Sequence, residues 1–315
     1  MARSSDFVAD SAQEKIMKVS IYSKSLLFGF KPGAIMASRV LRFSLSEGDA
    51  LISAQQFGAS GPGMINLAEM MSESDSCSDT DCEMVPCQTD FCEVFSPPRV
   101  CFALAPYGLQ SHLSFDLLSG WDFTTLGDRA KCLRMVHEHR PKWMMLSPPC
   151  TMYSPLQALF NLRKMSEAEK EARFKEANVL LDFSMALAMV QMRKGAYFCF
   201  EHPQKASSWQ RHTVQAVANS AGTFCVDFDQ CQTRLRAPEP DCRPIRKRTR
   251  LMTNCPAVRT VFSPLQCTCP PGTHCPIEGS IAGISLSKWC QVYTRVLCEK
   301  LAESVARALQ PHHFA

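Results

Sequence analysis

Short apolar runs alternate with helical patterns from residue 90 onward, and this alternation restricts the possible folds more than any other feature. Five runs have the length and composition of buried strands: 90–96, 112–118, 142–147, 196–201 and 223–229. A helical pattern separates each pair of successive runs, so the strands are joined by crossovers and run parallel. The sequence therefore predicts an α/β fold, a doubly wound Rossmann-like sheet with helices on both faces.

The strongest helical signal covers residues 166–195, where Ser166 and Glu169 form a capping box and Gly195 can end the helix. We also expect helices at 99–109 with an interruption at Pro106, at 128–139, at 207–222 and, as one closing helix, at 285–309.

Composition divides the chain into three parts. Residues 1–70 show no sustained periodicity and stay unassigned, whereas 71–87 form an acidic, serine-rich linker with too little apolar content to pack. The main domain is predicted at 88–310, with a smaller irregular region at about 229–284.

The chain is expected in a reducing compartment, either nuclear or cytoplasmic. Its longest apolar stretch, 179–190, is too short to span a membrane and contains Asp182. The N-terminus lacks the apolar segment of a secretory signal. The 17 cysteines are therefore expected as free thiols, metal ligands or nucleophiles rather than disulfides.

Chemically useful side chains fall at the carboxyl ends of several predicted strands. Ser96, Asp116, the segment 147–150 and Glu201 all lie at or just after such ends. Ligands of open α/β sheets bind in the crevice outside these ends, so one crevice is expected to gather a thiol and two carboxylates.

Two of these segments resemble the motifs of a known enzyme family, the DNA (cytosine-5) methyltransferases. "SPPCTMYS" (147–154) resembles the proline-cysteine motif of that family, and "FCFEHP" (198–203) resembles its glutamate motif. The block at 228–254 is similar to the later basic block of the phage-type and retroelement-borne branches. The order and spacing agree, and the similarity covers about 90–309.

The resemblance implies a mechanism. In that family a cysteine thiolate adds to C6 of a flipped-out cytosine, a glutamate contacts N3 and N4, and C5 takes a methyl group from S-adenosyl-L-methionine. It implies Cys150 as nucleophile and Glu201 as the ring-contacting group. The implied cofactor contacts are Phe95, Ser96, Asp116, Asp122 and Pro148. The implied contacts to nucleic acid, expected to be DNA, are Ser154, Arg234, Arg236, Arg246, Arg248 and Arg250.

Some positions depart from the family pattern. Pro97 and Arg99 stand where the cofactor motif has glycines, and Pro97 has no N–H and a fixed φ. His202 replaces the usual asparagine after the glutamate. Three functions therefore stay open: an active methyltransferase, a non-catalytic nucleic-acid-binding descendant from a retroelement polyprotein, and a purely structural or interaction module of such a polyprotein.

The loop at 267–276 offers weak metal candidates in Cys267, Cys269, His274 and Cys275. Their spacing matches no standard structural zinc site and adjacent His-Cys ligands are awkward, so zinc is not expected and the loop is assigned to substrate recognition. A zinc nucleobase deaminase is excluded, because no H-x-E precedes the cysteine and no second cysteine completes P-C-x-x-C.

Overall fold

A computed structural model describes residues 88–314 of the chain. The predicted N-terminal segment 1–70 and the linker 71–87 lie outside these described residues.

One sheet organises the described residues. Its strands are β1 (Phe91–Val94), β2 (Leu113–Phe115), β3 (Trp143–Leu146), β4 (Tyr197–Pro203), β5 (Phe224–Asp229) and β6 (Arg248–Thr253), in the order β2-β1-β3-β4-β6-β5. The first four strands pair in parallel, and β6 lies antiparallel between β4 and β5. The predicted α/β fold is confirmed as a mixed, largely parallel sheet.

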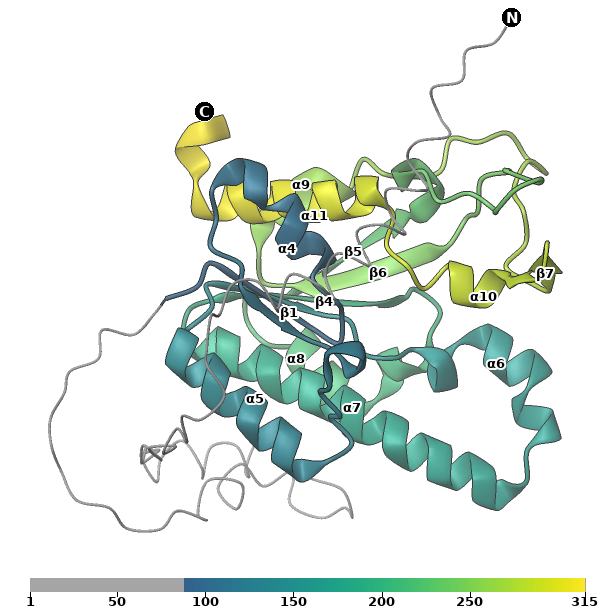
Figure 1. Cartoon of the computed structure of the whole chain (residues 1–315), viewed down its shortest axis with the longest axis horizontal. Helices are drawn as coiled ribbons and strands as arrows, with labels where there is room; N and C mark the ends of the chain where they lie inside the picture. Colours follow the sequence, from purple (N-terminus) through teal and green to yellow (C-terminus); the bar gives the residue numbers. More distant parts are fainter. Residues whose placement is uncertain (1–87, 315) are drawn as a thin grey trace, which may run out of the picture. The chain divides into compact units, whose positions relative to one another are not determined.

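Helices cover both faces of this sheet. They are α4 (Arg99–Ala103), α5 (Leu126–His139), α6 (Pro155–Phe160), α7 (Glu167–Arg193), α8 (His212–Ala218), α9 (Pro256–Phe262), α10 (Leu286–Trp289) and α11 (Arg295–Leu309). In Figure 1, α4, α9 and α11 lie on one face of the sheet and α5, α7 and α8 lie on the other. Single 3₁₀ turns connect many of these elements, among them η3 (Leu117–Ser119), η4 (Thr151–Tyr153), η6 (Ser207–Gln210) and η7 (Gln230–Thr233).

The strand sequences are apolar at successive positions because both faces of the sheet are buried. Cys92 and Met144 pack in one core with α5, α7 and α8. Phe91 and Trp143 pack in the other core with α4, α9 and α11. The two cores account for the continuous hydrophobic runs that predicted the strands.

The closing helix predicted at 285–309 is wrong as a single element, since it divides into α10 and α11. Thr294 begins the second helix, because its hydroxyl accepts a hydrogen bond from the Leu297 amide at 3.1 Å. The break turns Tyr293 inward, where it is 6% exposed. The capping box predicted for Ser166 and Glu169 is confirmed at the start of α7.

A small lobe, residues 230–247 and 263–292, extends from the carboxyl edge of the sheet. It has its own core and a hairpin of β7 (Ser280–Ile281) and β8 (Ile284–Ser285). The region predicted at 229–284 is thus divided, since β6 belongs to the main sheet and α9 packs in the α4 and α11 core. Within the described residues no helix is long and apolar enough to cross a bilayer.

Candidate functional site

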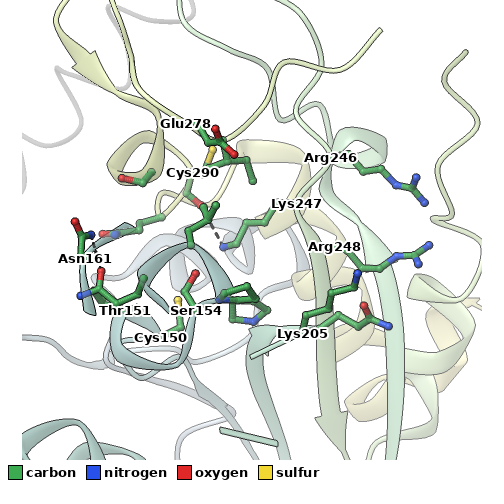
Figure 2. A pocket seen from close by; sticks show the side chains of 18 of the residues that line it. Cys150, Thr151, Ser154, Asn161, Lys205, Arg246, Lys247, Arg248, Glu278 and Cys290 are labelled. Atoms are coloured by element: carbon green, nitrogen blue, oxygen red, sulfur yellow. Dashed lines mark hydrogen bonds between the residues drawn. The ribbon is translucent and has the colours of Figure 1, made fainter. Parts of the chain in front are cut away.

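A cleft of about 600 Å³ lies between the carboxyl edge of the sheet and the small lobe. One wall comes from the segment after β3, where Cys150 and Ser154 line it. The opposite walls carry Arg246, Lys247 and Arg248, together with small-lobe residues such as Cys290. Figure 2 shows these side chains around the cavity, with Lys247 extending inward and the two arginines extending away from Cys150.

Lys247 joins the cleft to the predicted glutamate. Its ammonium lies 3.7 Å from Glu201 Oε1 and donates a hydrogen bond to the Cys290 carbonyl at 3.2 Å. Glu201 itself, at 8% exposed, lies behind the cleft lining. Burial alone lowers the pKa of Lys247, but Glu201 and the thiols of Cys150 and Cys290 outweigh it, so the pKa is raised and the cation is retained.

Tyr293 and Ser147 hold the other side of the glutamate. The Tyr293 phenol donates to Glu201 Oε2 at 3.2 Å and lies 2.8 Å from Ser147 Oγ. Burial raises the pKa of this phenol well above its ordinary value, so the phenol stays protonated. The Glu201 carboxylate is thus held by Lys247 and by Tyr293, which lies just before α11. Ser147, at the end of β3, contacts the Tyr293 phenol.

Cys150 rests as a thiol. Burial raises its pKa above the ordinary value of 9.0, the Lys247 ammonium lowers it, and Glu201 raises it again. Reaction as a nucleophile therefore requires that this thiol first give up its proton.

His202 positions the segment that carries Cys150. Its ring is fully buried, with Nε2 3.2 Å from the Pro148 carbonyl and Nδ1 2.7 Å from Ser208 Oγ. A carbonyl only accepts, so Nε2 donates to Pro148 and Nδ1 accepts from Ser208. Burial lowers the pKa of His202 to about 3, which keeps the ring neutral. The residue that departs from the family pattern thus ties β4 to the proline-cysteine loop.

The predicted arginines divide into two groups. Arg246 and Arg248 line the cleft and share the buried Asp229 carboxylate, with Nε–Oδ1 distances of 3.1 and 3.3 Å. Arg250 instead pairs with Asp227 at 2.7 Å and lies over the Trp209 ring. The remaining two, Arg234 and Arg236, are exposed on the small lobe and do not line the cleft.

The predicted cofactor contacts lie around the ends of β1 and β2 and have structural partners. Ser96 Oγ donates to Glu93 at 2.9 Å. Asp116 accepts from the Leu118 amide and caps η3, and Asp122 accepts from Thr124. Phe95 packs on Phe123, while Pro148 is buried and its carbonyl contacts His202. None of these predicted residues lines the cleft.

The turn between β1 and α4 does not fit a glycine-type cofactor loop. Pro97 and Pro98 supply no N–H, and the Arg99 amide donates to the Pro97 carbonyl at 2.6 Å. The Cys101 amide donates to the buried Glu93 carboxyl at 2.7 Å. The backbone N–H donors that would bind the methionine part of S-adenosyl-L-methionine are therefore absent at Pro97 and Pro98 and already hydrogen-bonded at Arg99 and Cys101. No methyl-transfer step follows from this turn.

A second cluster lies at the base of the small lobe and could hold a metal such as zinc. It consists of Cys231, Cys267, Cys269 and His274, whose ligand atoms all lie within 4.8 Å of one another. Zinc was not expected because of the spacing of the loop candidates and the adjacent His274 and Cys275, and the choice of Cys275 as a candidate ligand is wrong. Cys275 is 3% exposed in the small-lobe core and Cys231, which follows β5, takes the fourth position.

Three residues of these sites were not predicted. Lys247 had a signal, because the alternation in "RKRTR" (246–250) places it opposite Arg246 and Arg248. Tyr293 had none, since it fell inside the helix predicted at 285–309. Cys231 lies far from the other ligands in sequence, and only the fold brings them together.

Comparisons with known proteins add no assignment: no protein-family model matches the chain, and no curated protein matches it.

Proposed function

We propose that this chain is a DNA-binding protein of the cytosine-5 methyltransferase type, in which Cys150 adds to C6 of a cytosine held in the cleft. The observation that carries the proposal is that Cys150 follows β3 and lines the cleft, while Glu201 lies in the neighbouring strand β4 just beyond the paired residue Phe200. Lys247, which also lines the cleft, pairs with Glu201. We infer a Rossmann-like sheet, since the chain crosses from β1 to β2 on one side and to β3 on the other.

Charge and shape support a nucleotide ligand. The cleft is lined by three cations from one segment, Arg246, Lys247 and Arg248, and also by Lys205. The volume of about 600 Å³ is in the range of small-molecule sites and accommodates an extruded nucleoside. The arginines extend away from the thiol, where they suit the phosphates that flank a flipped base.

The covalent step balances without a cofactor. The Cys150 thiol gives its proton to a solvent water, its sulfur bonds to C6, and the electron pair of the C5–C6 double bond moves to C5. C5 then takes a proton from solvent. Loss of the original C5 proton and departure of the thiolate restore cytosine.

Deuterium exchange tests this step. Cytosine-containing single-stranded and duplex DNA is incubated with the protein in D₂O, and deuterium at C5 is measured by mass spectrometry. We expect exchange with the wild-type chain, none with Cys150→Ser, and wild-type exchange with Cys242→Ser, which removes an exposed thiol away from the cleft. DNA binding without exchange in the wild type would refute the covalent step.

A second candidate is a non-catalytic DNA-binding descendant, of the kind a retroelement polyprotein leaves. The β1–α4 turn favours it, because Pro97 and the engaged Cys101 amide leave no glycine-type cofactor loop. This candidate predicts salt-dependent binding that Cys150→Ser leaves unchanged, with no exchange at C5 and no calorimetric binding of S-adenosyl-L-methionine.

A further inference from the structure

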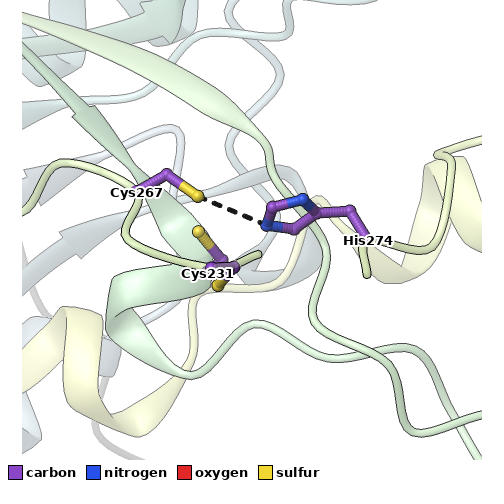
Figure 3. A group of neighbouring side chains, drawn as sticks. Cys231, Cys267 and His274 are labelled. Carbon is purple, nitrogen blue, oxygen red and sulfur yellow. Dashed lines mark hydrogen bonds between the residues drawn. The ribbon is translucent and has the colours of Figure 1, made fainter. Parts of the chain in front are cut away.

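We propose that Cys231, Cys267, Cys269 and His274 bind a structural zinc ion that joins the two segments of the small lobe, 230–247 and 263–292. Their donor atoms, three sulfurs and one imidazole nitrogen, are a set that zinc takes in structural sites. Figure 3 shows Cys231 and Cys267 facing the His274 ring from two separate segments of the chain.

The spacing of the donors fits a tetrahedral ion. Zinc bonds of about 2.3 Å to sulfur and about 2.0 Å to nitrogen place neighbouring ligand atoms about 3.5–3.8 Å apart. Cys267 Sγ lies 3.4 Å from His274 Nε2, and no pair among the four ligand atoms exceeds 4.8 Å. A small inward movement of the side chains completes the coordination. All four residues are partly exposed, which gives the ion a path of entry.

The small lobe needs such a crosslink. Its core consists of six buried residues: Leu235, Ala237, Ile245, Cys275, Leu286 and Cys290. The segment from α9 to β7 contains no helix or strand and supplies three of the four ligands. Because a core this small buries little apolar surface, regions of this kind are commonly stabilised by a metal or by disulfides.

The surroundings also suit a charged zinc centre. Three thiolates and one neutral imidazole give a Zn²⁺ site a net charge of about −1. The Cys267 amide donates to Asp229 at 3.0 Å, and Asp229 binds Arg246 and Arg248. These arginines lie close enough to balance the thiolates, and the Asp229 carboxylate holds the backbone of Cys267 in place through its amide.

Metal content of the full chain, purified under reducing conditions, tests the site. We expect one zinc per chain by mass spectrometry of the metal, and X-ray absorption with three sulfurs and one nitrogen around it. Cobalt substitution should give the visible spectrum of a tetrahedral thiolate site.

Variants identify the ligands. We expect Cys231→Ser to lose the metal, whereas Cys275→Ser and Cys242→Ser keep it. Should Cys231→Ser fail to fold, His274→Cys is decisive, because it should retain cobalt with a spectrum shifted toward four thiolates. A wild-type chain that neither contains zinc nor takes it up, a zinc content unaffected by Cys231→Ser, or a Cys231–Cys267 disulfide under reducing conditions would each overturn the proposal.

Discussion

The pH dependence of stability is governed in part by two buried groups with opposite effects, His202 and Glu93. Burial lowers the pKa of His202 from 6.5 to about 3. Between about pH 3 and pH 6.5, His202 therefore binds a proton in the unfolded chain but stays neutral in the folded chain. Stability from the neutral ring is lost as pH falls, by about 1.4 kcal/mol for each pH unit in this interval.

Glu93 acts in the other direction. Burial raises its pKa from 4.5 to about 7, although the Cys101 amide and Ser96 oppose the shift. The folded chain then holds a proton that the unfolded chain releases above pH 4.5. Stability from this carboxyl is complete below pH 4.5 and is lost as pH rises to about 7, again by about 1.4 kcal/mol per unit. Between pH 4.5 and 6.5 the two slopes cancel.

Single substitutions should expose each slope. Relative to wild type, Glu93→Gln should lose about 2–3 kcal/mol of unfolding free energy from pH 6.5 to 4.5, and His202→Gln should gain the same amount. Urea unfolding followed by tryptophan fluorescence measures both. Other titrating groups, including metal ligands, are common to all three chains and cancel in the differences. Parallel pH profiles for the three proteins would refute the reasoning, and the double variant should return to the wild-type slope.

The cleft and the metal cluster carry the remaining predictions. Lys247→Met leaves the buried Glu201 carboxylate without its cation and should cost about 3–5 kcal/mol in urea unfolding; recovery of most of that loss on adding Glu201→Gln checks the pairing. Arg246→Ala should weaken DNA binding and lower the slope of the logarithm of the binding constant against the logarithm of salt concentration by about 1. Arg236→Ala, which lies outside the cleft, should leave that slope unchanged. Equal slopes for wild type and Arg246→Ala would exclude Arg246 from phosphate contact. Chelating the zinc should lower the melting temperature and open the small lobe to proteolysis, whereas a melting temperature unchanged by the chelator would contradict a structural metal.

Local patterns predicted the four parallel strands and β5, because β1, β3 and most of β4 are buried on both faces and a helix follows each of the first four strands. The α7 capping box, for example, depends only on Ser166 and Glu169. The antiparallel strand β6 was not predicted, because its sequence is basic and no α-helix separates it from β5. Long-range effects explain the other errors. At the break before α11, Tyr293 donates to Glu201, which lies 92 positions away in the chain, and no local pattern reports that contact. A set of metal ligands divided between η7 and the 267–274 loop likewise has no sequence signal, because only the fold brings the two segments together.

The β5–β6 pairing also bears on how this protein can diversify. Residues 230–247 leave the sheet after Asp229 and return at Arg248, and these two residues face each other in one antiparallel ladder. Because the two ends of this segment are adjacent, it can be lengthened, shortened or replaced by another loop without changing the register between β5 and β6. Two positions restrict such a replacement, since the new loop must keep a metal ligand at position 231 and the cation of Lys247 that pairs with Glu201. New binding preferences can therefore evolve by loop replacement while the sheet and its thiol stay in place.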